Sequence, residues 1–145
     1  MSPLLAAALV IGVLAVAALA GAWIRRRDGR ARATDARAVT PDMLAADPGS
    51  FGDRATLVQF STEMCARCPG TRRLLGQLAS ETDGVGYVDV DLTHRTDIAR
   101  AFDVLQTPTV LVLDAAGVQR TRIGGAPRRE DVLAALAAAG EPARV

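Results

Sequence analysis

The sequence contains no lysine, a single histidine and only two cysteines among its 145 residues. A structural zinc ion needs four protein ligands, so two cysteines and His94 cannot form such a site, and we expect no metal. All 17 basic residues are arginines, set against 16 acidic residues. From Ala38 onward, fourteen acids outnumber eleven arginines. The body of the chain therefore offers no basic face for nucleic acid, and we expect none as a partner.

Charge is missing altogether from Leu4 to Ile24, a run of 21 residues. As a helix this run would be about 31 Å long, close to the roughly 30 Å hydrocarbon core of a membrane. Trp23 lies at its end, where interfacial aromatic residues are common. We therefore predict a transmembrane helix in residues 1–24, with residues 4–24 in the membrane. A cleavable signal peptide is the alternative, although the start of the chain has no basic side chain.

The residues that follow the apolar run are strongly basic. Between Arg25 and Arg37, six arginines stand against two aspartates, a net charge of +4. We interpret residues 25–38 as a basic juxtamembrane linker. Because positive charge flanks membrane spans on their cytoplasmic side, we predict a single-pass protein of the cell membrane whose domain, residues 39–145, faces the cytoplasm. The opposite topology, with this domain outside the membrane, is the alternative.

Strand-like and helix-like patterns alternate in residues 39–145. Their order, strand-helix-strand-helix-strand-strand-helix, predicts an α/β fold with a mixed central sheet flanked by helices. The expected strands are 55–61, 85–90, 109–113 and 118–123, with a short edge strand at 36–39. The expected helices are one that starts at Thr40-Pro41, then 65–81, 93–102 and a last helix from Pro127 to Gly140.

The two cysteines stand where an apolar strand is expected to pass into a helix, in the motif Cys65-Ala66-Arg67-Cys68. Their spacing brings the second sulfur within bonding reach of the first. The partial positive charge of a helix N-terminus favours a thiolate there. The sequence thus predicts a redox pair in which Cys65, the first cysteine, attacks and Cys68 resolves. A purely structural disulfide is the other possibility, but so short a loop adds little stability.

Three features in this order resemble the thioredoxin family: the cysteine motif between strand and helix, Thr107-Pro108 before an apolar strand, and Gly124-Gly125 after a hairpin. The resemblance covers about Val39 to Ala139 and implies a thioredoxin-like fold. It implies that the Thr107–Pro108 bond is cis and that the backbone of Thr107 pairs with an extended substrate. On the same grounds the expected substrate contacts are Met64, Thr107, Pro108 and Gly124.

The chain also departs from the family pattern at two supporting positions. Gln59 stands where the family usually has a buried aspartate, and an amide cannot accept a proton as a carboxylate does. We therefore expect a slow resolving step, with Glu63 as the other candidate base. Arg67 adds a positive charge between the cysteines. It should favour the Cys65 thiolate, hence the reduced form and a more oxidising couple.

These features together predict a membrane-anchored thiol–disulfide oxidoreductase that reduces or exchanges protein disulfides and needs no cofactor beyond its dithiol. Its expected partners are disulfide-bonded proteins and a thiol reductant or thioredoxin reductase, and we expect a monomer. One alternative is an extracytoplasmic thioredoxin-like reductase for secreted proteins or apocytochrome. Another is a non-catalytic binding module with the same fold.

Overall fold

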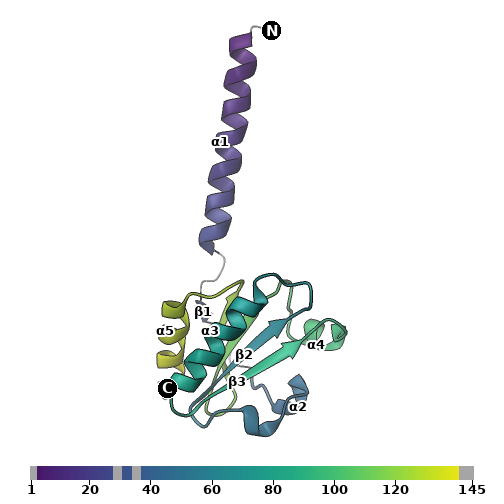
Figure 1. The fold of residues 1–145 in the computed structure, drawn as a ribbon, viewed down its shortest axis with the longest axis vertical. Coiled ribbons are helices and arrows are strands. Elements are labelled where there is room, and N and C mark those ends of the chain that lie inside the picture. Colours follow the sequence, from purple (N-terminus) through teal and green to yellow (C-terminus); the bar gives the residue numbers. More distant parts are fainter. Residues whose placement is uncertain (1–2, 28–30, 34–36, 141–145) are drawn as a thin grey trace.

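The centre of the molecule is a five-stranded mixed sheet in the order β1-β5-β4-β2-β3 (Figure 1). The computed structural model describes residues 3–27, 31–33 and 37–140. Strand β2 pairs parallel with β3 and antiparallel with β4, while β5 pairs antiparallel with β4 and with β1. The strands are β1 (Ala31–Ala33), β2 (Ala55–Ser61), β3 (Val85–Asp91), β4 (Thr109–Asp114) and β5 (Gln119–Gly124). This mixed sheet confirms the predicted fold class.

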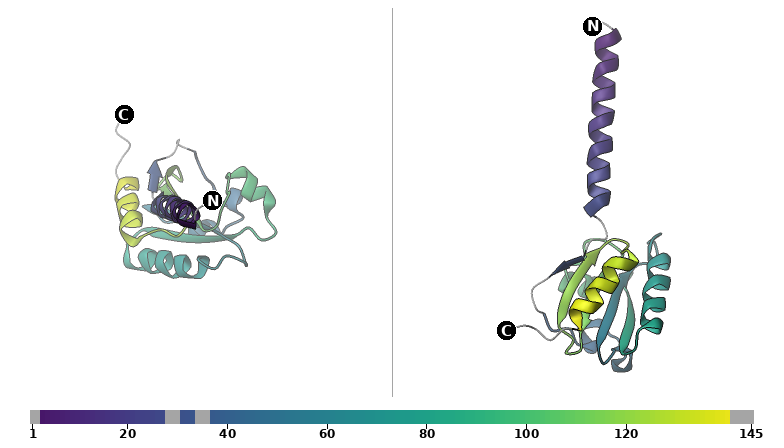
Figure 2. Two further views of the ribbon diagram at one scale, coloured as in Figure 1. Left: turned by 90° about the horizontal axis from the view of Figure 1, so that it is seen from above. Right: turned by 90° about the vertical axis from the view of Figure 1, so that its left-hand side faces the viewer.

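Helices cover both faces of the sheet, and each face has its own apolar core (Figure 2). Because side chains alternate along a strand, Leu57 of β2 packs toward α3 and α5, whereas Val58 and Phe60 pack toward α2 and α4. All three side chains are fully buried. The helices are α1 (Pro3–Arg27), α2 (Pro41–Leu44), α3 (Cys68–Glu81), α4 (Thr96–Ala101) and α5 (Arg129–Ala139), with a 3₁₀ turn at Pro48–Ser50.

Helix α1 projects from the domain (Figure 1), and its apolar side chains are exposed, for example Leu9 at 62%. It ends at Arg27 rather than at residue 24, since arginine is a good helix former. Within the ranges that the structure describes, no helix combines the length and the apolar character needed to cross a membrane. The predicted span over residues 4–24 is therefore not supported.

The predicted position of the edge strand is wrong. This strand was expected at 36–39 but lies at Ala31–Ala33, within the predicted linker, where it pairs with residues 121–123 of β5. Of the predicted segment, Ala36 lies outside the described residues and Ala38 forms a single bridge to Val118. The position of so short a strand depends on the strand with which it pairs rather than on its own residue pattern. Part of the predicted linker thus completes the sheet.

Helix α3 begins at Cys68, three residues later than predicted. Pro69 occupies its first turn, a position that suits proline because the first N–H groups of a helix have no partner within it. Before it, Cys65 N donates to Thr62 O at 3.1 Å, and Cys68 N donates to Cys65 O at 3.2 Å. These consecutive turns, rather than the helix itself, hold Cys65.

The predicted bounds of the other helices also shift. Helix α4 starts at Thr96 instead of 93, since Thr93 N donates to the Asp91 carboxylate at 2.8 Å in a local turn. Helix α5 starts at Arg129, two residues after Pro127, and ends before Gly140 as predicted. The start of α2 at Thr40-Pro41 is confirmed, although the Thr40 side chain makes no capping hydrogen bond.

Candidate active site

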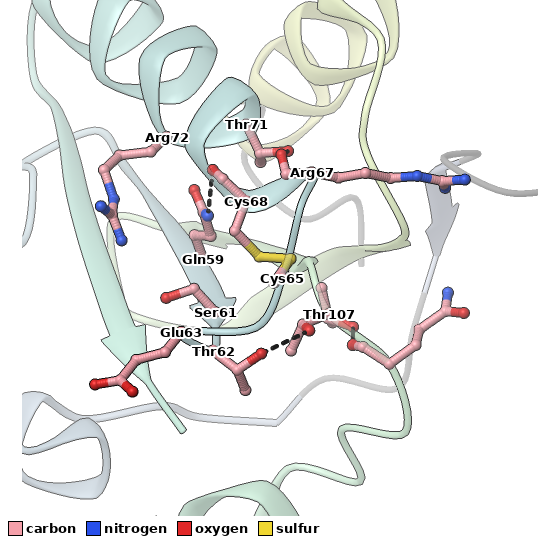
Figure 3. Close-up of a disulfide and its surroundings, with 12 residues drawn as sticks. Gln59, Ser61, Thr62, Glu63, Cys65, Arg67, Cys68, Thr71, Arg72 and Thr107 are labelled. Atoms are coloured by element: carbon pink, nitrogen blue, oxygen red, sulfur yellow. Dashed lines mark hydrogen bonds between the residues drawn. A yellow bond between two sulfur atoms is a disulfide. The ribbon is translucent and has the colours of Figure 1, made fainter. Parts of the chain in front are cut away.

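Cys65 and Cys68 form a disulfide between the loop that follows β2 and the first residue of α3 (Figure 3). The S–S distance is 2.05 Å and the Cα atoms are 5.4 Å apart, both usual for a disulfide. Cys68 is buried, with 2% of its surface exposed, whereas Cys65 is partly exposed. The two sulfurs therefore differ in access in the way that the predicted roles require.

The N-terminus of α3 is held by Thr71. Its backbone N–H and its hydroxyl both donate to the carbonyl of Arg67 at 3.2 Å. Helix N-termini carry a partial positive charge. A thiolate at Cys65, three residues before the start of α3, would be stabilised by this charge. The Arg67 side chain is exposed, so water screens its own charge.

The Thr107–Pro108 peptide bond is cis, as the resemblance implied. The hydroxyl of Thr107 lies 3.3 Å from the hydroxyl of Thr62, which ties this loop to the turn before Cys65 (Figure 3). The Pro108 carbonyl accepts a hydrogen bond from Gly125 N at 2.8 Å. Gly125 has a φ of 91°, a conformation that favours glycine.

Gly124 has a different role from its neighbour. A Cβ atom at this position would lie 2.7 Å from Nε2 of Gln106, so the glycine makes room for that side chain beside the cis-proline loop. The predicted contact of Gly124 with substrate stays a prediction.

Two large apolar side chains that are close to site residues in the sequence are almost fully exposed. Met64, directly before Cys65, is 94% exposed, and Leu105, two residues before Thr107, is 95% exposed. Met64 was predicted as a substrate contact, whereas Leu105 was missed. Its only signal in the sequence is its position just before Thr107-Pro108, outside the expected helix.

Gln59 lies beneath the disulfide and is completely buried. Its Nε2 donates to the Cys68 carbonyl at 3.1 Å, and its Oε1 accepts a hydrogen bond from the Tyr87 hydroxyl at 3.0 Å. Burial, and then the negative charge of Asp89, raise the pKa of Tyr87 to about 12. The tyrosine thus stays protonated and fixes the amide, so that Gln59 positions the backbone of Cys68.

A second chain of polar groups lies beside Gln59, and sequence reasoning missed it. The buried Ser61 hydroxyl donates to the Asp89 carboxylate at 2.8 Å, and Asp89 forms an ion pair with Arg72 of α3. The carboxylate raises the pKa of Arg72 above its ordinary value. Ser61 follows Gln59 by two residues and so shares its face of β2. The only hint in the sequence was the alternation of polar residues at 59 and 61 and at 87 and 89.

The remaining predicted residues lie at the edge of the site. Glu63 is exposed, and its backbone N–H donates to the Thr93 hydroxyl at 3.0 Å. Arg67 lines a shallow groove of about 350 Å³ together with Arg73, between the first turn of α3 and Ala126-Pro127. His94 is exposed in the loop before α4. In the part of the chain that the structure describes, no group of three or more histidine, cysteine or acidic residues could hold a metal ion.

Comparison with known proteins places this geometry in a family. The chain is 28% identical to a thioredoxin of Mycoplasma pneumoniae over 76 residues, which cover 52% of this chain and 74% of that protein. Its fold is similar to a thioredoxin variant from Halobacterium salinarum, with a TM-score of 0.56 and 19% identity over 66% of this chain and 82% of the other. Thioredoxin f from spinach chloroplast has a TM-score of 0.56 and 22% identity over 70% and 85% of the two chains.

The family model of thioredoxin matches residues 50–138, from the turn before β2 to the end of α5. This range contains both cysteines and the cis-proline. Family and cysteine pair together support thiol–disulfide oxidoreductase chemistry in general. The chain belongs to the thioredoxin family.

Proposed function

We propose that this protein reduces or exchanges disulfide bonds in other proteins through Cys65 and Cys68. The observation that carries the proposal is the asymmetry of the pair, a partly exposed Cys65 and a buried Cys68 in one disulfide beside Thr107-Pro108. A structural disulfide has no need for an accessible cysteine, whereas a cysteine that attacks a substrate must be reached by it.

The reaction follows from which sulfur a substrate can reach. In the reduced protein, the Cys65 thiolate attacks one sulfur of the substrate disulfide and releases the other as a thiolate. Cys68 then loses its proton and attacks the Cys65 sulfur, which releases the second substrate thiolate and forms the Cys65–Cys68 disulfide. Two electrons pass to the substrate, and an external thiol reductant restores the dithiol.

Activation of Cys65 accounts for only a small part of the rate. An ordinary cysteine with a pKa of about 8.5 is roughly 3% thiolate at pH 7. Lowering that pKa to about 7 gives roughly 50% thiolate, but nucleophilicity falls with the pKa, so the net gain is about threefold. Positioning of the substrate disulfide must contribute more. We expect the exposed side chain of Met64 and the Thr107-Pro108 loop to do this.

Trapping of mixed disulfides tests the two roles. Cys68→Ser should accumulate covalent complexes with a disulfide-bonded substrate such as insulin, because Cys65 attacks but nothing resolves the product. Cys65→Ser should accumulate few, since its remaining thiol is buried. The double variant is the control for non-covalent capture, and mass spectrometry of non-reduced complexes gives the readout. Equal trapping by the two single variants would contradict the assignment.

Turnover separates an enzyme from a binding module. With excess dithiothreitol as the reductant, the wild-type protein should accelerate reduction of insulin disulfides, and either single variant should lose this activity. A module that only holds its partner would bind insulin without raising the rate above that of the double variant.

A further inference from the structure

The resolving step needs a group that accepts the proton of Cys68, and the usual candidates around this site are unsuited. Gln59 is an amide. Tyr87, with a pKa of about 12, stays protonated. Hydrogen bonds from Thr93 lower the pKa of Asp91, which makes it a poorer acceptor. Glu63 is exposed at the rim. The remaining carboxylate beside these residues is Asp89.

Asp89 is connected to the interior of the site by a buried hydroxyl. Ser61 is only 2% exposed and donates to Asp89 Oδ1 at 2.8 Å. It lies on the same face of β2 as Gln59, one step closer to the turn that carries Cys65 (Figure 3). Gln59 is bonded to the Cys68 carbonyl, and Ser61, the next residue on this face of β2, lies near the disulfide and is bonded to the carboxylate (Figure 3). The parallel register pairs Gln59 with Asp89 directly across the two strands.

The direction of the Ser61 hydrogen bond decides what the hydroxyl can do next. A serine hydroxyl has one hydrogen to donate and two lone pairs that accept. A carboxylate can only accept, so the hydrogen of Ser61 is committed to Asp89. The lone pairs of Ser61 can thus accept from a second donor, and a reduced Cys68 thiol has a hydrogen to donate.

We propose that Asp89 accepts, through Ser61, the proton that Cys68 loses in the resolving step; this inference rests on the proposed function. As the Cys68 thiol gives its proton to the Ser61 oxygen, the Ser61 proton passes to Asp89. The Cys68 sulfur forms a bond to the Cys65 sulfur, and the bond from Cys65 to the substrate breaks. The substrate sulfur leaves with the electron pair as a thiolate, and Asp89 becomes a neutral acid until solvent removes its proton.

Arg72 is the charged partner of this carboxylate. The Arg72 side chain is 55% exposed, so water weakens the ion pair. Tyr87 and Asp91 are the other titratable groups on the same face of β3. Neighbouring β2 contributes the uncharged Gln59 and Ser61, and the 3₁₀ turn Pro48–Ser50 contributes no charge. Removal of Arg72 should leave the carboxylate and its hydrogen bond from Ser61 in place.

A disulfide that releases two chromophores separates the two chemical steps. When the reduced protein attacks neutral dithiodipyridine, Cys65 releases the first thiopyridone and Cys68 releases the second, so stopped-flow absorbance gives two phases. Asp89→Asn and Ser61→Ala should leave the first phase unchanged and slow the second by roughly 10- to 100-fold at pH 7, toward the lower end of general-base contributions because water can substitute in part.

The Arg72→Gln variant distinguishes two roles for Asp89, that of a proton acceptor and that of a partner in a structural ion pair. If Asp89 is the acceptor, this variant should keep a second phase about as fast as that of the wild type, because the carboxylate and its hydrogen bond from Ser61 remain. The exposed Asp97→Asn, which also breaks an ion pair with an arginine, is the matched control and should change neither phase. Thermal unfolding checks that each variant is folded.

The outcomes of this experiment are distinct. An unchanged second phase in folded Asp89→Asn overturns the inference, and so does an Arg72→Gln variant that slows as much as Asp89→Asn. Loss of the first phase in the wild-type protein would instead overturn the proposed function.

Discussion

At the scale of single residues, the site depends on Gln59, a buried amide whose two ends have different partners. Its oxygen accepts a hydrogen bond from Tyr87, and its nitrogen donates to the Cys68 carbonyl. Buried polar groups that lose such partners cost about 1–3 kcal/mol. Gln59 therefore fixes the backbone of Cys68.

Gln59→Glu should make the stability of the protein depend on pH. A protonated glutamic acid can still donate to the Cys68 carbonyl, but a buried carboxylate cannot, so burial raises the pKa of the new side chain in the folded state. The variant should match the wild type below about pH 4. It should lose stability as the pH rises past about 4.3 and through the raised folded-state pKa, by roughly 2–3 kcal/mol at pH 7. Urea unfolding at several pH values gives the measurement.

The exposed Gln106→Glu is the matched control for this change of charge, and we expect it to shift stability by less than about 0.5 kcal/mol. If Gln59→Glu unfolds with the same pH dependence as the wild type, the amide does not have the positioning role described above.

Of the single residues at the site, the sequence could predict those that stand in short local motifs. The cysteine pair and the cis-proline stand in short motifs, so both were found. The Ser61–Asp89–Arg72 chain joins β2, β3 and α3, and its contacts depend on the register between two parallel strands. A single sequence does not specify that register, because the two strands are separated by a whole helix.

At the scale of elements, Asp114 closes the hairpin between β4 and β5. Its Oδ1 accepts hydrogen bonds from Ala116 N and Val118 N, both at 2.9 Å, and its Oδ2 accepts from Arg120 Nε at 2.7 Å. Gly117 completes the turn with a φ of 73°. This turn was predicted from its Asp and Gly residues, although β5 starts one residue later than expected. Side-chain hydrogen bonds of this kind follow the local sequence, which is why turns are easier to predict than register.

Asp114→Asn should destabilise the protein by about 1–3 kcal/mol at pH 7. Burial opposes ionisation of Asp114, but the hydrogen bonds from Val118 and Arg120 hold its pKa below the ordinary value. A lowered folded-state pKa stabilises the protein above the unfolded value of about 3.9, and this contribution is lost as the pH falls through the folded-state pKa. The difference between variant and wild type should thus shrink below about pH 4.

Chemical unfolding at pH 7 and pH 3 measures this difference, with exposed Asp53→Asn as the control. A variant as stable as the wild type at pH 7 would show that the hairpin does not depend on the carboxylate.

Local turns also explain why the predicted bounds of α3 and α4 were misplaced. Each helix start is set by a turn before it, through Thr62 O and the Asp91 carboxylate, and helical periodicity says nothing about such turns.

At the scale of the whole molecule, the layers were predictable and the edges were not. Alternation in β2 and helical spacing in α3 and α5 indicate which side chains form the two cores, so the order of elements led to the correct fold class. The short strand β1 contains only three residues, and it lies in a segment whose charge suggested a linker. Its position follows from the free edge of β5, which local residue patterns do not reveal.

Two truncated chains, beginning at residue 30 and at residue 37, should show where the domain starts. The first lacks α1, none of whose described side chains belongs to either core, so its midpoint of urea unfolding should equal that of the full chain. The second also lacks β1 and its hydrogen bonds to residues 121–123 of β5. At about 0.5–1.5 kcal/mol for each bond, it should be less stable by roughly 1–3 kcal/mol.

Both truncated chains should keep the two phases of dithiodipyridine reduction, because Cys65 and Cys68 lie between the end of β2 and the start of α3. Equal stability of the two truncated chains would show that β1 adds nothing to the sheet, and a loss already in the chain from residue 30 would show that α1 belongs to the folded domain.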